Sequence, residues 1–209
     1  ELPAVLGASH NGCHVERYVL RQDNDFDLDD GFLPFLMERK PEAVFLCNPN
    51  NPTGRILPFD TLEKILEFCH QHHTRLFLDE CFLDLSDEGI SMKGYLKVYP
   101  ELCILKAFTK SYGMAGVRLG YCLCSDEELL EKMSRTVQPW NVSILAQAAG
   151  VAALSETQFL AKTKALIPVE RRWLKGELEA LGLWVCPSKA NYLLFYGEPE
   201  LHTTLKKHG

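Results

Sequence analysis

The 209-residue sequence lacks several features that would assign it to a specialised class. No uncharged apolar run approaches the roughly 18 residues that a membrane-spanning helix needs, which argues against a membrane span. No basic cluster stands out among the 22 basic and 28 acidic residues, so nucleic acid is not an expected partner. There is no internal repeat or low-complexity tract, and Glu1 to Ala8 lack the basic start and long apolar stretch of a signal peptide. We therefore expect a globular, cytoplasmic protein.

The eight cysteines and seven histidines form no motif typical of disulfide scaffolds or metal centres. No two cysteines form a CxxC pair, and a chain of this size does not need disulfide staples. His70, His72 and His73 crowd one helix end without a second ligand cluster at zinc spacing, so we interpret them as a solvated helix end. Reduced, buried thiols are expected for the cysteines in apolar runs, which are Cys47, Cys69, Cys81, Cys103, Cys122 and Cys124.

Short apolar runs alternate with helical patterns along the chain. Ala43–Cys47 is typical of a buried strand, and Phe59–Gln71 of a helix, because its apolar residues recur at i, i+3, i+4 and i+7. The further strands expected are Arg75–Leu78, Leu102–Phe108, Leu119–Cys124, Leu183–Val185 and Asn191–Phe195. Strand, helix and strand in succession indicate an α/β fold with a mainly parallel sheet, in which ligands bind beyond the carboxyl ends of the strands.

The second half of the chain is richer in helical patterns. Ser125 is a plausible N-cap, with Glu128 as its capping-box partner, for a helix that ends near Arg135. Ser143–Leu154 is apolar nearly all round, so we expect a buried helix. A long helix is expected over Glu156–Leu181, kinked at Pro168, and a last helix from Pro199. The change of pattern predicts a large domain over residues 1–154 and an incomplete small domain over 155–209.

Asn51 lies in the segment Asn48-Pro49-Asn50-Asn51-Pro52-Thr53-Gly54, directly after a predicted buried strand. A surface turn is one interpretation, since Asn, Pro and Gly are turn residues. The alternative is a stiff loop at the ligand edge of the sheet, where the Asn51 amide can hold a phenolic oxygen.

Asp79 stands at the end of the next predicted strand and is followed by Glu80. A strand-terminal Asp is often a loop cap, but a carboxylate at a ligand edge can instead pair with a protonated ring nitrogen. Because neighbouring side chains of a strand point to opposite faces, only one of the two acids can face a ligand.

Lys110 follows a third apolar strand and opens a Gly-rich turn. Most lysines are simply solvated. Here Thr109 and Arg118 flank Lys110 with a hydroxyl and a guanidinium that can bind phosphate. A partly desolvated lysine near cations is a nucleophile toward carbonyls, so the combination points to chemistry.

In this order and setting, Asn51, Asp79, Lys110 and Arg118 resemble the site of the fold-type I enzymes of the class I/II aminotransferase family, which use pyridoxal 5′-phosphate (PLP). The resemblance covers nearly the whole chain and implies a three-layer large domain. It implies that Lys110 holds PLP as a Schiff base, that Asp79 pairs with the pyridine nitrogen, and that Asn51 binds the phenolic oxygen. Thr109 and Arg118 correspond to phosphate ligands.

Two departures from the family pattern stand out. Ala107 lies where relatives carry Ser or Thr, which removes one phosphate ligand. The resemblance also leads us to expect a chain truncated at both ends, without the phosphate-cradling loop, the ring-stacking aromatic and the carboxylate-clamping arginine. Complete relatives are homodimers with shared active sites.

Two subgroups fit the resemblance, threonine-phosphate decarboxylase and histidinol-phosphate aminotransferase. Phe82, where many aminotransferases of the family carry Tyr, favours the decarboxylase, as do the segments Gln138–Ser143 with Trp140 and Ser188–Leu194. Trp140 can equally be a packing aromatic. Decarboxylation of O-phospho-L-threonine to aminopropanol phosphate, used in cobalamin assembly, is thus the leading hypothesis, with a small phosphorylated substrate in either subgroup. The alternatives of another class are a non-catalytic aminotransferase-like sensor module and an inactive fragment.

Overall fold

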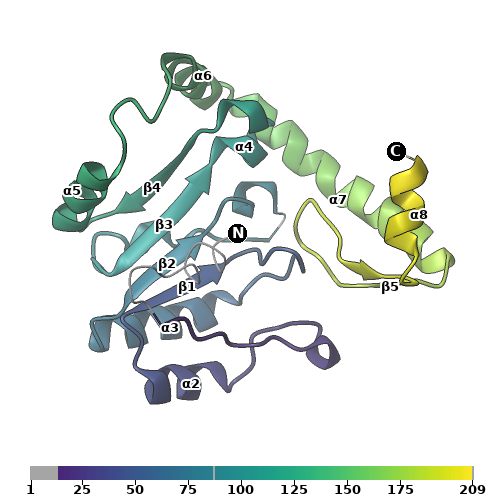
Figure 1. Cartoon of the computed structure of the whole chain (residues 1–209), viewed down its shortest axis with the longest axis horizontal. Helices are drawn as coiled ribbons and strands as arrows, with labels where there is room; N and C mark the ends of the chain where they lie inside the picture. Colours follow the sequence, from purple (N-terminus) through teal and green to yellow (C-terminus); the bar gives the residue numbers. More distant parts are fainter. Residues whose placement is uncertain (1–13, 87, 209) are drawn as a thin grey trace.

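The computed structural model describes residues 14–86 and 88–208, so the interpretation of Glu1 to Ala8 lies outside the described residues (Figure 1). Its centre is a sheet with the strand order β1 (Ala43–Cys47), β2 (Arg75–Asp79), β3 (Leu102–Ala107) and β4 (Gly120–Cys124). The pairs β1–β2 and β2–β3 are parallel, whereas β4 runs antiparallel to β3. The predicted α/β fold with a mainly parallel sheet is confirmed.

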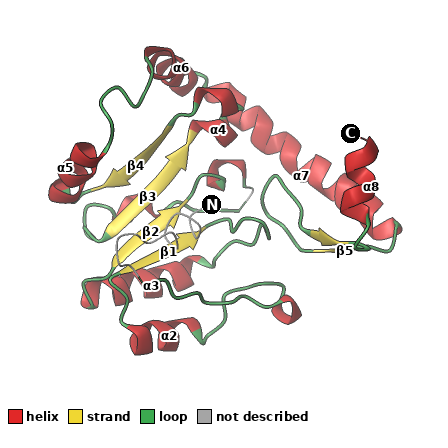
Figure 2. Ribbon diagram, viewed as in Figure 1, coloured by secondary structure: helices red, strands yellow, loops and turns green. Residues whose placement is uncertain are grey.

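One face of the sheet carries the main hydrophobic core. Helices α2 (Phe32–Arg39) and α3 (Phe59–Gln71) lie on this side (Figures 1 and 2). The periodic residues of α3 are at most 1% exposed, as the sequence predicted, because they pack against the same-face residues of β2 and β3. The residues at the centre of this contact are Leu62, Ile65, Leu66, Cys69, Leu76, Leu78, Leu102 and Ile104.

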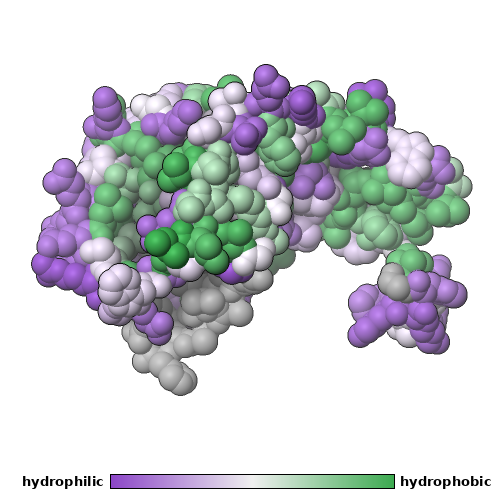
Figure 3. All heavy atoms as spheres, turned by 90° about the horizontal axis from the view of Figure 1, so that it is seen from above, coloured by the Kyte–Doolittle hydropathy of each residue, from purple (hydrophilic) through white to green (hydrophobic). Residues whose placement is uncertain are grey.

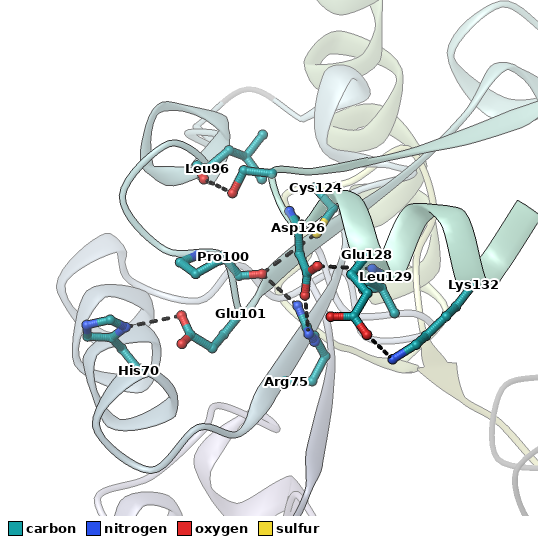
Figure 4. Close-up of polar contacts among 11 residues, drawn as sticks. His70, Arg75, Leu96, Pro100, Glu101, Cys124, Asp126, Glu128, Leu129 and Lys132 are labelled. Carbon is teal, nitrogen blue, oxygen red and sulfur yellow. Dashed lines mark hydrogen bonds and ion pairs between the residues drawn. The ribbon is translucent and has the colours of Figure 1, made fainter.

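Helix α5 (Glu127–Thr136) begins one residue later than predicted. Its N-cap is Asp126, whose Oδ1 accepts a hydrogen bond from Leu129 N–H at 3.0 Å, whereas the Ser125 hydroxyl donates to the Leu96 carbonyl at 2.5 Å. The other carboxylate oxygen of Asp126 accepts from Arg75 Nη2 at 2.7 Å (Figure 4). The prediction of Ser125 as the cap was therefore wrong, because a tertiary ion pair selects Asp126 between two adjacent residues that both suit the position.

Helix α6 (Ile144–Ser155) begins and ends one residue later than predicted, and the Ser143 hydroxyl caps it by accepting from Ala146 N–H at 3.1 Å. The prediction that it is buried was wrong for the described residues. Only Ala146, Gly150 and Ala153 are buried, on the face where Gly150 approaches Leu119. Its large side chains point outward and are 62–80% exposed, namely Ile144, Leu145, Val151 and Leu154. Hydrophobic side chains accordingly gather on the surface seen from above (Figure 3). An apolar composition indicates that the surface of a helix favours contact with other apolar groups. It does not indicate which segment of the chain makes that contact.

Helix α7 (Thr157–Ala180) is continuous through Pro168 and extends away from the sheet (Figure 1). Beyond it, β5 (Trp184–Val185) pairs antiparallel with β6 (Phe195–Tyr196), and α8 (Leu201–His208) follows. The predicted strand Asn191–Phe195 was therefore wrong over residues 191–194. The Tyr192 hydroxyl instead donates a hydrogen bond to the Asn50 carbonyl, in the loop that follows β1. The short elements are η1 (Gln22–Asn24), η2 (Leu83–Leu85), η3 (Met92–Tyr95), α4 (Phe108–Ser111) and η4 (Ala115–Val117).

The seven described cysteines are all free thiols, as predicted, but only Cys69, Cys103 and Cys186 are fully buried. The expectation of burial was wrong for Cys47, Cys81, Cys122 and Cys124, which are partly exposed. His70 is half-exposed, with its Nδ1 3.1 Å from Glu101 Oε2. Among the described residues, no helix is long and apolar enough to cross a membrane, and no group of side chains is arranged to hold a metal ion.

The packing of α3 on the sheet gives a stability prediction. Leu66→Ala removes a side chain that is 1% exposed, so we expect the free energy of unfolding to fall by about 2–5 kcal/mol. Urea unfolding measures this change. Leu205→Ala is the matched control, because Leu205 is 54% exposed on α8 and its loss should cost less than about 0.5 kcal/mol. Equal losses in both variants would contradict the proposed core.

The cap of α5 gives a pH prediction. The hydrogen bond from Leu129 N–H, and next the contact with Arg75, hold the pKa of Asp126 below its usual value. A lowered folded-state pKa contributes stability that is present above the unfolded pKa of about 3.9 and is lost as the pH falls through the folded value. Asp126→Asn keeps a capping residue but not the charge. We therefore expect the variant to be less stable at neutral pH, and the difference in urea midpoint to shrink as the pH falls below about 4 and to vanish only below the lowered folded-state pKa of Asp126. A difference that persists unchanged in acid would refute the charge's role.

Candidate functional site at the carboxyl edge of the sheet

Three of the predicted site residues follow three neighbouring parallel strands. The register pairs Cys47 with Asp79 and Asp79 with Leu105, so β1, β2 and β3 end at the same edge of the sheet. Asn51 follows β1 by four residues, Asp79 is the last residue of β2, and Lys110 lies in α4 directly after β3. Parallel pairing thus brings side chains that are 28 and 31 residues apart in the sequence to one edge.

The loop that carries Asn51 is held by its own polar groups. Asn50 Nδ2 donates to Thr53 Oγ1 at 2.8 Å, Gly54 N–H donates to the Asn50 carbonyl at 2.7 Å, and Asn48 Oδ1 accepts from Leu57 N–H at 2.9 Å. The Asn51 side chain is exposed and makes no hydrogen bond within the described residues. The loop is thus fixed while the Asn51 amide remains available for a ligand.

The same loop is fastened to the segment that follows β5. Lys189 N–H donates to the Gly54 carbonyl at 2.8 Å, and the Tyr192 hydroxyl donates to the Asn50 carbonyl at 2.9 Å. Gly54 has a φ of +71°, and a Cβ there would lie 1.9 Å from Ser188 Oγ. Only glycine satisfies both the backbone conformation and the close approach.

Asp79 and Glu80 point to opposite faces, as the strand geometry predicted. Glu80 is fully buried on the core side. Asp79 is partly exposed, and its Oδ1 accepts a hydrogen bond from Cys81 N–H at 2.9 Å. Burial, together with the charge of Asp79, raises the pKa of the Cys47 thiol to about 11. Burial, and then a side-chain hydrogen bond with Asp79, also raise the pKa of Cys81. These thiols are therefore protonated at neutral pH, which makes them poor candidates for a nucleophile.

Lys110 lies against an aromatic pair. Its Nζ is 5.4 Å from the centroid of the Phe82 ring, and that ring packs edge-on against Tyr192 at a centroid distance of 4.8 Å. The Lys110 side chain is exposed and makes no hydrogen bond or ion pair within the described residues. The expectation of partial desolvation is therefore not met in this structure, whereas the amine is free to react.

Thr109 and Arg118 are less closely engaged with this edge. Thr109 is partly buried on α4. Arg118 is exposed, has a φ of +55°, and donates from Nη1 to the Ala115 carbonyl of its own turn at 3.1 Å. No hydrogen bond or ion pair in the described part of the chain joins Asn51, Asp79, Lys110 and Arg118 to one another. None of these four side chains is therefore paired with another of the four.

Tyr192 is a further residue at this edge, and no local sequence pattern marks it as a site residue. Its hydroxyl and ring connect the Asn51 loop to Phe82 and hence to Lys110. Burial is the main cause that raises the pKa of Tyr192. The contact between Tyr192 and Asn50 spans 142 residues, and no local pattern reports such a separation.

The donor set fits the groups of PLP. A carboxylate, an amide, a primary amine, a hydroxyl and a guanidinium correspond in kind to the pyridine nitrogen, the phenolic oxygen, the aldehyde and the phosphate of that cofactor. The amine and the amide make no hydrogen bond or ion pair within the described residues, which leaves them available for those contacts.

Comparison of the sequence with protein families assigns it to a known family. The model of the family "Aminotransferase class I and II" matches residues 6–207. A threonine-phosphate decarboxylase from Salmonella typhimurium is 34% identical over 92% of this chain and 53% of its own length. A histidinol-phosphate aminotransferase from an Anaeromyxobacter species is 38% identical over 90% of this chain and 51% of its own length.

Solved structures agree with this assignment. The histidinol-phosphate aminotransferase from Clostridium acetobutylicum matches with a TM-score of 0.81 and 26% identity over 89% of this chain and 57% of that one. A decarboxylase from Sulfurospirillum multivorans matches with a TM-score of 0.79 and 25% identity over 91% and 50%. The histidinol-phosphate aminotransferase from Sinorhizobium meliloti, solved in complex with pyridoxal-5′-phosphate, matches with a TM-score of 0.73 and 25% identity over 87% and 49%.

This chain spans about half the length of the curated relatives that it matches. The family match nevertheless extends over nearly all of the chain. The chain belongs to the class I and II aminotransferase family.

Proposed function

We propose that the chain is the core of a PLP-dependent enzyme whose cofactor binds at the carboxyl edge of the sheet. The observation that carries the proposal is the convergence of Asn51, Asp79 and Lys110 after three adjacent parallel strands. In this proposal residues 1–154 form the cofactor-binding domain and residues 155–209 begin a second one. A homodimer of the whole protein, which the family resemblance implies, belongs to the same proposal.

Asp79 and Lys110 have the central roles. The Asp79 carboxylate accepts a hydrogen bond from the pyridine nitrogen and keeps that nitrogen protonated by its negative charge. When bound, PLP supplies an electron sink that stabilises negative charge at the substrate Cα. The Lys110 amine would hold the cofactor covalently, and the same amine could carry a proton to or from the substrate Cα.

The other predicted residues orient the cofactor. The Asn51 amide donates to the phenolic oxygen, and its loop is held independently of any ligand by Asn48 and Asn50. Arg118 and Thr109 bind the phosphate, for which Arg118 must exchange its contact with the Ala115 carbonyl. Ala107 offers no hydroxyl, so phosphate binding lacks one neutral hydrogen bond, a loss of roughly 1 kcal/mol.

Decarboxylation of O-phospho-L-threonine to aminopropanol phosphate is the reaction that we favour. The supporting residue is Phe82, which lies against Lys110 and Tyr192 and has no hydroxyl to donate to the phenolic oxygen. Loss of the substrate carboxylate as CO₂, rather than loss of the Cα proton, would require contacts with the substrate that orient the Cα–carboxylate bond for cleavage. The 34% identity with the Salmonella decarboxylase supports the same reaction.

Transamination of histidinol phosphate is the second candidate. It is favoured by the 38% identity with the Anaeromyxobacter aminotransferase over 90% of this chain. Both reactions use the same roles for Asp79 and Lys110 and differ in which Cα bond breaks.

The cofactor proposal predicts a visible absorption band. The purified chain mixed with PLP should show a band that survives desalting, because Lys110 attaches the cofactor covalently. Lys110→Ala should show none, whereas Lys97→Met, which changes an exposed lysine, should keep it. A lasting band in Lys110→Ala would mean that another lysine reacts, and no lasting band in the unsubstituted chain would overturn PLP binding by this part of the protein.

The reaction proposal predicts a product. We expect release of CO₂ from O-phospho-L-threonine, and a fall of at least about a hundredfold in Lys110→Ala, the usual minimum for loss of a general acid or base. Trapping of CO₂ and chromatography of aminopropanol phosphate measure the rate. Turnover of histidinol phosphate that requires 2-oxoglutarate, without CO₂ release from O-phospho-L-threonine, would replace the decarboxylase by the aminotransferase.

A further inference from the structure

A cluster of charged side chains lies on the core side of the sheet, on the face opposite Asp79. It consists of Glu80, which is fully buried, Lys106, whose side chain is 8% exposed, and Asp84, which is 38% exposed. We call these three residues the Glu80–Lys106–Asp84 network. Buried charges are costly to desolvate and are seldom retained for stability alone.

The sheet register explains why Glu80 and Lys106 meet. Leu78 is paired with Ile104, and Glu80 N–H donates to the Leu105 carbonyl at 3.0 Å just beyond the end of the β2 ladder. Residues at even positions of both strands face the core, so Glu80 and Lys106 continue the buried row formed by Leu78 and Ile104. A carboxylate and an ammonium group thus replace the last hydrophobic pair at the ligand edge.

Every member of the network has specific partners. Lys106 Nζ lies 2.8 Å from Asp84 Oδ1 and 3.6 Å from Glu80 Oε2. Glu80 also accepts hydrogen bonds from the Ser91 hydroxyl at 2.6 Å and from Met92 N–H at 2.9 Å. The buried carboxylate is therefore satisfied on both oxygens and held in one position.

The network reaches the segment that carries Lys110. The Ser111 hydroxyl is buried and donates to Asp84 Oδ2 at 3.3 Å. Helix α4 is a single turn of four residues without a side-chain cap, and such a turn does not hold its conformation by itself. Two contacts hold the turn in place. The N–H of the buried Phe108 donates to the Leu119 carbonyl at 3.1 Å, and the Ser111 hydroxyl donates to Asp84.

The two ends of the network adjoin the two residues with central roles in the proposed chemistry. Glu80 directly follows Asp79, and Ser111 directly follows Lys110. We propose that Lys106, together with Glu80 and Asp84, is a positioning residue that fixes Lys110 relative to Asp79. This inference rests on the proposed function, in which a cofactor bound to Asp79 must present its reactive carbon to Lys110.

A double-mutant cycle tests the inference through the PLP dissociation constant. Lys106→Met should raise this constant by roughly tenfold in the chain that has Lys110, because the amine no longer meets the cofactor held by Asp79. In the Lys110→Ala background the same change should raise it by less than about twofold, since no amine is left to position. Lys97→Met is the matched control and should leave both values unchanged. Equal losses in both backgrounds would mean general destabilisation and would overturn the inference.

Hydrogen exchange tests the same inference without cofactor. Tyr112 N–H donates to the Phe108 carbonyl and closes the turn of α4. We expect its exchange to quicken by roughly tenfold or more in Lys106→Met, whereas amides in the middle of α3 stay unchanged. Ser111→Ala, which removes only the link to Asp84, should act in the same direction and serves if Lys106→Met does not fold. Unchanged exchange at Tyr112 in both variants would refute the positioning role.

The two arms separate the two proposals. If the unsubstituted chain and Lys97→Met both fail to bind PLP, the proposed function fails, and hydrogen exchange alone decides whether the network orders α4. If both bind PLP and Lys106→Met binds it equally well, the positioning inference fails while the proposed function stands.

Discussion

The parallel pairing of β1, β2 and β3 is the constraint on which the candidate site depends. Each of these strands is short, and its register with the next strand decides which side chains reach the edge. A slip of one residue between β2 and β3 would exchange the faces of Asp79 and Glu80 and bring a different acid to the ligand. The buried contact of α3 with Leu76 and Leu78 opposes such a slip, because it would move two large side chains out of the core. The hydrophobic core and the position of the carboxylate are therefore two results of one register.

Local periodicity was sufficient for the elements that make this sheet. The strand Ala43–Cys47 and the helix Phe59–Gln71 were predicted at their observed bounds, because each has one apolar pattern and a clear stop. The prediction was weaker where two adjacent residues satisfy the same local rule, as at Ser125 and Asp126, since the partner that decides between them is Arg75, 51 residues away. It was wrong for the exposed face of α6, because hydrophobicity reports what a surface prefers and not which segment covers it.

The candidate residues themselves were identified from the sequence by their order and by the strand ends that they follow. What the sequence could not provide was their surroundings. The contacts of Tyr192 with Asn50 and Phe82, and those of Lys106 with Asp84 and Glu80, join segments separated by 22 to 142 residues. Such contacts depend on how the chain returns to the sheet edge, and an isolated Tyr or Lys in the sequence gives no sign of them. The same holds for the exposure of Lys110, which depends on the residues around it and not on its neighbours in sequence.

The close approach of Gly54 to Ser188 links two regions that lie far apart in the chain. The loop that bears Asn51 is hydrogen-bonded to Lys189 and Tyr192, so its position depends on both regions. If the segment after β5 shifts as a rigid unit, it must either break these hydrogen bonds or pull the loop with it. The Asn51 amide would then move toward or away from Asp79 as the two regions rotate. A displacement near residue 188 would therefore change the distance between Asn51 and Asp79 at the edge of the sheet.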